Sequence, residues 1–167
     1  MIFIGLQIIH EKNEYFYEKK VARYTISAIM LMISGEGMEK YIVVKQKHLY
    51  TNERYLMYEG QAFFSNKDGC LRLSYKEKDS DTKVTINAKN DELMIERKGE
   101  LITRLSFQYH ETTTGSVMSE FGMFDIGVYT HKYIKKENII AIEYDILSGD
   151  EVTDGYRIIW VIKEDLV

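Results

Sequence analysis

Short segments that alternate between apolar and polar residues, separated by turn residues, constrain the fold of this sequence most strongly. In one of them, Leu71, Leu73 and Tyr75 alternate with polar neighbours. This period of two is typical of a β-strand with one buried face. From residue 38 onward the pattern recurs in about ten segments joined by short loops. Because short loops join antiparallel neighbours, the sequence predicts an antiparallel meander.

Turn residues separate these segments and indicate how the strands connect. The sequence contains no proline, so its turns depend on Gly, Asn, Asp and Ser. Asp68-Gly69 predicts a tight hairpin, because both residue types tolerate positive φ. Gly60 and Gly127 lie inside alternating segments, where glycine often marks a bulge. We therefore predict an all-β fold, a closed antiparallel meander barrel of roughly 8–10 strands, in which closure removes exposed sheet edges.

The stretch from residue 118 to residue 130 is the most distinctive part of the sequence. It reads Met-Ser-Glu-Phe-Gly-Met-Phe-Asp-Ile-Gly-Val-Tyr-Thr. Gly122 suits a tight turn, and Phe124, Ile126 and Val128 then alternate as in a strand with one buried face. The stretch thus predicts a hairpin turn followed by a half-buried strand.

This stretch resembles the hallmark of the YwiB-like family of uncharacterised bacterial proteins, in which Thr-Pro-aromatic-Gly precedes a strand ending in Thr. This chain departs from that pattern at Ser119 and Glu120, which puts the turn geometry in doubt but not the strand. Three further runs are similar to family motifs: Tyr75-Lys76-Glu77, Leu105-Ser106-Phe107 and the segment 142–146. The resemblance covers roughly residue 39 to the C-terminus. It implies a lipocalin-like (calycin-like) β-barrel with no assigned activity.

Charge and cysteine content narrow the classes of partner and compartment. The net charge of −4 argues against nucleic acid as a partner. Cys70 is the single cysteine, so it forms no disulfide within the chain, which fits a cytoplasmic location. The apolar run 21–34 contains Arg23 and is shorter than the roughly 20 residues of a membrane helix. We therefore expect no association with a membrane.

Residues 1–37 precede the alternating segments and form a separate N-terminal extension, with the barrel domain at 38–167. A helix over 13–33 is one interpretation, with Asn13 as N-cap and Gly35 as stop; two strands are the alternative. Gly35-Glu36-Gly37 directly precedes Met38, and codons for this tripeptide can form a ribosome-binding sequence. Translation from Met38 is therefore one hypothesis. The other is an extension that packs on the barrel or on a second subunit.

Motifs for catalysis are missing from the sequence. It contains no Gly-x-Ser-x-Gly and no glycine-rich phosphate loop. The histidines are scattered, so we expect no metal site, no cofactor and no catalytic residues. One alternative is that His110, Glu111, Glu120 and His131 converge at one barrel mouth.

Inward-facing aromatic residues are candidate ligand-binding residues, together with Glu77 and Arg97 as a polar anchor for the head group of a ligand. With period two, Glu77 faces inward together with Tyr75, and a buried carboxylate needs a partner. Arg97 is the candidate partner, whereas Arg104 faces outward. The aromatic residues expected to line the interior are Tyr58, Tyr75, Phe107, Phe124, Tyr144 and Trp160.

Three functions remain open at this point. The first is a binding module for a small apolar or amphipathic ligand, because a barrel of this size can hold one. The second is a structural or protein-interaction module with a filled core, in which a homodimer is one arrangement. An enzyme using the barrel mouth is the third and the least supported.

Overall fold

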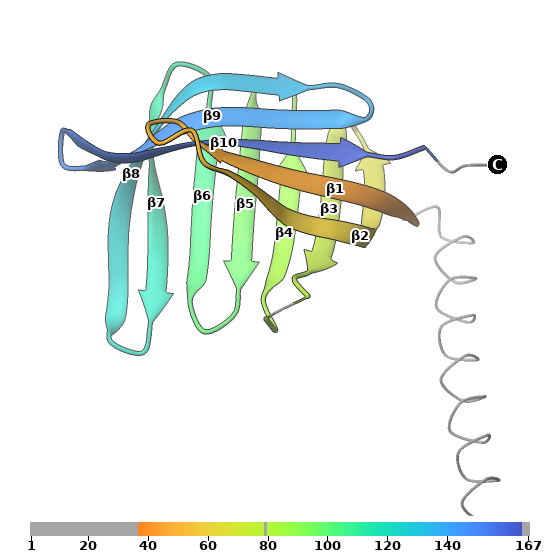
Figure 1. Ribbon diagram of the computed structural model, residues 1–167, viewed down its shortest axis with the longest axis horizontal. Coiled ribbons are helices and arrows are strands. Elements are labelled where there is room, and N and C mark those ends of the chain that lie inside the picture. Colours follow the sequence, from red (N-terminus) through yellow and green to blue (C-terminus); the bar gives the residue numbers. More distant parts are fainter. Residues whose placement is uncertain (1–36, 79, 165–167) are drawn as a thin grey trace, which may run out of the picture. The chain divides into compact units, whose positions relative to one another are not determined.

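The computed structural model describes residues 37–78 and 80–164. The described residues form ten β-strands and no helix (Figure 1). The strands are β1 (Met38–His48), β2 (Arg54–Lys67), β3 (Cys70–Lys76), β4 (Lys83–Ala88), β5 (Glu92–Lys98), β6 (Ile102–Gln108), β7 (Thr112–Ser119), β8 (Gly122–Lys135), β9 (Ile139–Ser148) and β10 (Glu151–Ile162).

The strands close into one barrel in the order β1-β10-β9-β8-β7-β6-β5-β4-β3-β2. Consecutive strands pair antiparallel, and β10 pairs with β1 through Trp160 opposite Val44. The predicted all-β closed antiparallel meander is confirmed. The hairpin predicted at Asp68-Gly69 is confirmed as well, since both residues have positive φ, 53° and 76°.

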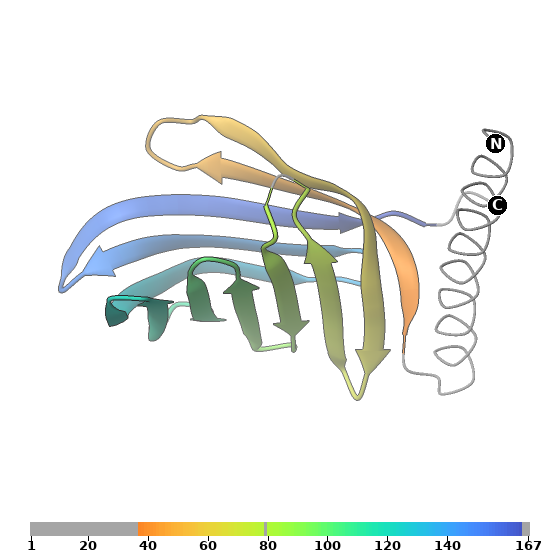
Figure 2. The ribbon, with the colours of Figure 1, turned by 90° about the horizontal axis from the view of Figure 1, so that it is seen from below.

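Two groups of strands cross each other over the core (Figure 1). In Figure 1, β9, β10 and β1 run across the picture, whereas β4 to β7 run down it. Figure 2 shows the orange β1 and the blue β10 on one side and the green β4 to β6 on the other. The lower ends of β5 to β8 in Figure 1 extend beyond the strands that cross them.

Local irregularities lie in β10, where the register shifts between Val152 and Asp154, and in the two longest strands, β2 and β8, of 14 residues each. In β2, Gly60 has a φ of 156°, and the Tyr58 ring lies against it, where a Cβ would come within 3.0 Å of the Tyr58 hydroxyl. In β8 the register shifts between Thr130 and Lys132. The bulge predicted at Gly127 is wrong, because Gly127 pairs regularly with Leu147.

The antiparallel meander places alternate turns at the same end of the barrel. The turns β1–β2, β3–β4, β5–β6, β7–β8 and β9–β10 therefore lie together, and we call this end the mouth. The opposite end carries the other four turns. The core between them consists of inward side chains from β1 to β6 and from β8 to β10, with Ile42, Leu73, Ile86, Leu93, Phe107 and Val128 fully buried.

The predictions for the N-terminal part fall outside the described residues. These are the helix over 13–33, the extension 1–37 and a start of translation at Met38. Within the ranges that the structure describes, no helix is long and apolar enough to cross a membrane.

Candidate functional site

Aromatic rings fill the barrel interior where β2, β3 and β10 meet. The rings of Tyr58 and Tyr75 stack with centroids 4.4 Å apart. The indole Nε1–H of Trp160 donates a hydrogen bond to the Tyr75 hydroxyl at 3.3 Å. Burial raises the pKa of Tyr75 to about 12, because the ionised phenol would lose its hydration. All three side chains are buried as predicted, and Tyr75 contacts the other two.

A second aromatic group lies on the side of β6, β9 and β10. Phe107 and Tyr144 meet edge to face, with centroids 4.8 Å apart, and Tyr156 lies 5.9 Å from Tyr144. Phe107 and Tyr144 are buried, as predicted. Burial also raises the pKa of Tyr144 far above its ordinary value.

One row of inward side chains passes from the buried core to the open mouth. Directly opposite residues of an antiparallel pair share a face of the sheet. The pairings from β3 to β8 therefore place six residues on the inner face: Tyr75, Val84, Arg97, Thr103, Val117 and Phe124. The row begins with buried residues on β3 and β4 and ends with Phe124, which is 57% exposed.

Phe124 corrects the prediction that it lines the buried interior. Its register places it on the inner face, opposite Val117. However, this end of the β7–β8 hairpin extends past the strands that cross the barrel (Figure 1), so little covers the ring. At the mouth, the inner face of β7 and β8 thus carries the apolar side chains Val117 and Phe124, and Phe124 is largely uncovered.

A charged pair stands beside this open surface. The guanidinium Nη2 of Arg97 donates to the Glu77 carboxylate at 2.7 Å, and the Glu77 side chain is 20% exposed. The predicted pairing of Glu77 with Arg97 is confirmed. Arg104, one strand further, faces outward as predicted and pairs with Glu96 at 2.7 Å.

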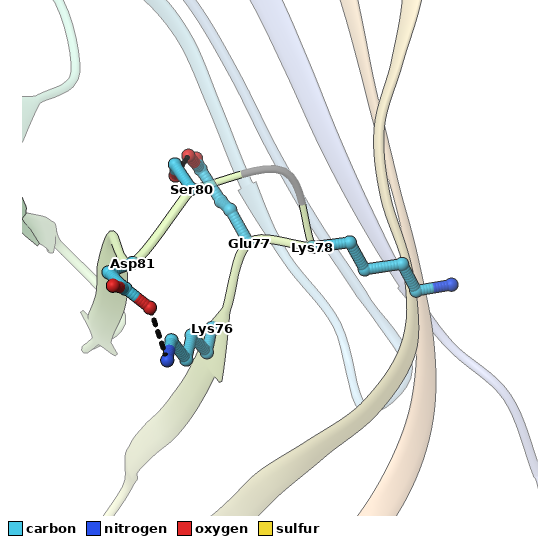
Figure 3. Close-up of a pocket in the computed structure, with 5 residues that line it drawn as sticks. All are labelled: Lys76, Glu77, Lys78, Ser80 and Asp81. Carbon is cyan, nitrogen blue, oxygen red and sulfur yellow. Dashed lines mark hydrogen bonds and ion pairs between the residues drawn. The ribbon is translucent and has the colours of Figure 1, made fainter.

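An open polar pocket of about 470 Å³ adjoins the pair at the β3–β4 turn (Figure 3). Its lining is polar or charged throughout: Lys76, Glu77, Lys78, Ser80 and Asp81. Lys76 pairs with Asp81 at 2.6 Å, and Ser80 donates to Glu77 at 3.1 Å. In Figure 3, Lys78 points away from the other four. Glu77 therefore connects a polar pocket with the apolar inner face.

Sequence reasoning missed a polar group at the mouth. His48 on β1 and Tyr156 on β10 are opposite each other, and both bind the Asp154 carboxylate, Tyr156 at 2.6 Å. The His48 Nδ1 accepts backbone N–H groups of residues 50 and 51. The other ring nitrogen, Nε2, therefore carries the hydrogen that is donated to Asp154. The period-two alternation of β10 could have indicated this group, because Asp154, Tyr156 and Trp160 are at alternate positions and therefore share one face of the strand.

A second missed group surrounds a buried carboxylate on the outer face. Asp145 is only 5% exposed and accepts hydrogen bonds from Tyr50 at 2.8 Å and His131 at 2.7 Å. Gly155 leaves room for this arrangement, because a Cβ there would lie 2.6 Å from Asp145 and 2.8 Å from Tyr50. No pattern in the sequence indicated that a turn residue reaches across to β9.

The alternative cluster of His110, Glu111, Glu120 and His131 is wrong. His131 pairs with Asp145, and His110 packs on the ring of Tyr109 with centroids 4.0 Å apart. Across residues 37–78 and 80–164, no group of three or more His, Cys, Asp or Glu side chains is arranged to hold a metal ion.

Comparisons with known proteins agree with the geometry. Among solved structures, the chain is similar to the crystal structure of the ywiB protein from Bacillus subtilis, with a TM-score of 0.58 and 18% identity. The alignment covers 78% of this chain and 98% of that one; at this identity it shows the fold alone. A search of curated proteins found no match. Residues 42–159 match the family model described as a domain of unknown function, DUF1934. Since that model covers more than half of the chain, the protein belongs to the DUF1934 family and has its YwiB-like barrel fold.

Proposed function

We propose that this protein is a binding module for a small amphipathic molecule, which it holds at the mouth of the barrel. The observation that carries the proposal is the inner-face row from Tyr75 to Phe124, which leaves the buried core and ends uncovered. A soluble barrel normally buries an inward aromatic side chain. An inward phenylalanine that is 57% exposed is an apolar surface available to a ligand.

The depth of the site follows from the packing of the core. Tyr75 contacts both Tyr58 and Trp160, so the ligand's apolar part lies above these rings rather than among them. Val117 and Phe124 contact this apolar part, and Arg97 with Glu77 faces its polar end. In this proposal the aromatic core supports the site from below, and the ligand contacts residues at the mouth.

Native mass spectrometry of protein purified gently from its own cell tests the proposal. We expect a reproducible extra mass of a few hundred daltons on the barrel. Phe124→Ser should remove that mass. Met123→Ser is the matched control, because Met123 is the neighbouring residue, is 64% exposed and points to the opposite face. Bare chain in all preparations, or equal loss of the mass in both variants, would refute the proposal.

A second candidate is a protein-interaction module. The β7–β8 turn favours it, because Phe121 is 84% exposed and lies beside Met123 and Met118 on the same hairpin. Apolar side chains concentrated at a turn are typical of contact surfaces. A second copy of the chain is then the simplest partner. A dimer peak that disappears with Phe121→Ser would favour this candidate.

The compartment follows from the single thiol. We propose that the protein works in the cytoplasm, because Cys70 is free in a chain without any disulfide among its described residues. Cell fractionation followed by detection with an antibody tests this directly. Recovery of the protein outside the cytoplasmic fraction would exclude the assignment.

A further inference from the structure

The β1–β2 turn at the mouth is folded around the imidazole ring of His48, the last residue of β1. The ring nitrogen Nδ1 accepts hydrogen bonds from the backbone N–H groups of Tyr50 at 3.2 Å and Thr51 at 3.1 Å. Within the part of the chain that the structure describes, these two N–H groups have no other acceptor. Through Nε2 the same ring binds Asp154 on β10. His48 therefore connects the turn to the neighbouring strand.

This arrangement requires an uncharged ring. A ring nitrogen that accepts hydrogen bonds carries no hydrogen, so the single hydrogen of neutral His48 is on Nε2. Protonation would place a second hydrogen on Nδ1, towards which the N–H groups of Tyr50 and Thr51 already point. Three donors would then face one another without an acceptor. The turn therefore keeps this conformation only while His48 is neutral.

Asp154 holds the ring in both protonation states. Hydrogen bonds from Tyr156 and then from His48 lower the pKa of Asp154, so its carboxyl group is still ionised at about pH 5. A carboxylate accepts a hydrogen bond more strongly from a charged ring than from a neutral one. Across residues 37–78 and 80–164, His48 is the basic side chain that pairs with this carboxylate. Protonation would thus keep the ring on Asp154 and remove its bonds to the turn.

The phenols around the ring do not change charge near neutral pH. Tyr156 on β10 and Tyr50 on the turn both meet the ring of His48 edge to face. The hydrogen bond to Asp154 raises the pKa of Tyr156 to about 12, and the hydrogen bond to Asp145 raises the pKa of Tyr50. Both phenols therefore stay neutral between about pH 8 and about pH 5.

Other ionisable groups lie one contact further away. Tyr144 on β9 packs on Tyr156, and Tyr55 on β2 donates to Glu53 at the end of the turn. A second histidine, His131, binds the other oxygen of the Asp145 carboxylate to which Tyr50 donates. A change of charge on His131 is therefore the main effect that has to be separated from one on His48.

We infer that the β1–β2 turn is a pH-sensitive element of the mouth, in which protonation of His48 releases residues 50 and 51 while the ring stays bound to Asp154. The release changes the rim of the mouth where β1, β2 and β10 meet. Leu49 stays attached, because its N–H donates to the carbonyl of Gly155 at 2.9 Å and needs no contact with the ring. The inference is independent of what the mouth binds.

Nuclear magnetic resonance of the isotope-labelled full-length protein between about pH 8 and about pH 5 tests the inference. The ring nitrogen shifts of His48 report its protonation. Amide exchange rates, divided by those of an unstructured chain at the same pH, give the protection of each N–H. We expect the protection of Tyr50 and Thr51 to fall at least about tenfold as the His48 ring becomes charged. Leu49 should keep its protection.

Two substitutions of His48 form a matched pair. The side-chain oxygen of His48→Asn lies near the position of Nδ1 and accepts hydrogen bonds at any pH. This variant should therefore protect residues 50 and 51 across the whole pH range. The longer side chain of His48→Gln reaches towards Asp154 instead, so the two amides should lack protection at every pH. His131→Gln should leave the pH-dependent loss as it is in the unmodified protein.

Several results would overturn the inference. One is constant protection of Tyr50 and Thr51 while the His48 ring becomes charged, and another is a ring that is still neutral at about pH 5. A loss that also affects Leu49 would indicate general unfolding instead of release of the turn. A loss that persists in His48→Asn or disappears in His131→Gln, with thermal unfolding showing folded protein, would assign the effect to a group other than His48.

Discussion

Replacing Tyr75 with phenylalanine should change the stability of the barrel in a way that depends on pH. The substitution leaves the buried Nε1–H of Trp160 without its acceptor. At neutral pH we expect a loss of about 1–2 kcal/mol in the free energy of unfolding, the cost of one buried, unpaired donor. The aromatic ring stays in place, so the stack on Tyr58 is kept.

The alkaline side of the prediction follows from the pKa of Tyr75. Burial raises this pKa from 10.0 to about 12. The folded state keeps the phenol neutral, so its stabilisation is complete below pH 10 and is lost as the pH rises towards 12. A shift of two units corresponds to about 2.7 kcal/mol in total, of which about 0.8 kcal/mol is lost by about pH 10.5. Tyr75→Phe has no such loss.

Urea unfolding of both proteins at about pH 7.5 and about pH 10.5 measures this difference. The variant should be less stable at the lower pH, and the gap should narrow by about 0.8 kcal/mol at the higher pH. Tyr109→Phe controls for loss of an exposed hydroxyl. A gap that stays constant or widens would refute the reasoning that Tyr75 is buried in its neutral form.

Three further substitutions test other parts of the structure. Gly115→Ala should destabilise the barrel by about 1–3 kcal/mol in thermal unfolding, because the new Cβ would lie 2.5 Å from the Leu105 side chain and 2.9 Å from backbone. In urea unfolding, His131→Leu should lower the free energy of unfolding more than Asp145→Asn does. Without His131, the buried Asp145 carboxylate keeps one partner, Tyr50, whereas the Tyr50 and His131 donors that Asp145→Asn releases reach water. The hydrogen bonds from Tyr156 and then His48 lower the pKa of Asp154 below 3.8. Asp154→Asn should therefore lower the free energy of unfolding at neutral pH. The difference in stability between the two proteins should vanish as the pH falls through that lowered pKa.

The sequence predicted the barrel wall well because the wall depends on local patterns. Period-two alternation identifies inward residues strand by strand, and Asp68-Gly69 identifies a turn from two residues alone. The same alternation correctly placed Glu77 inward and offered Arg97 as its partner. Such inferences need only the strand itself and one neighbour.

Features that depend on where strands cross were not predictable from the sequence. Phe124 has an inward register, but its exposure depends on how far the β7–β8 hairpin extends beyond the crossing strands. Asp145 has an outward register, yet the turn carrying Tyr50 covers it. Gly127 has the residue type of a bulge, whereas the register shift lies three residues later, at Thr130. Tertiary arrangement decided each of these cases.

The pairing of β1 with β10 has a consequence for how the protein is made. It joins Ile42 to Ile162, near opposite ends of the barrel sequence. On a ribosome, nine strands emerge before the last one is available, so the early sheet keeps an unpaired edge at β1 for most of synthesis. Contacts between such distant residues form slowly, and unpaired edges attract other chains. The final dozen residues of the barrel, which form β10, therefore close it last. Their pairing with β1 removes the unpaired edge at which the incomplete sheet would be prone to aggregate.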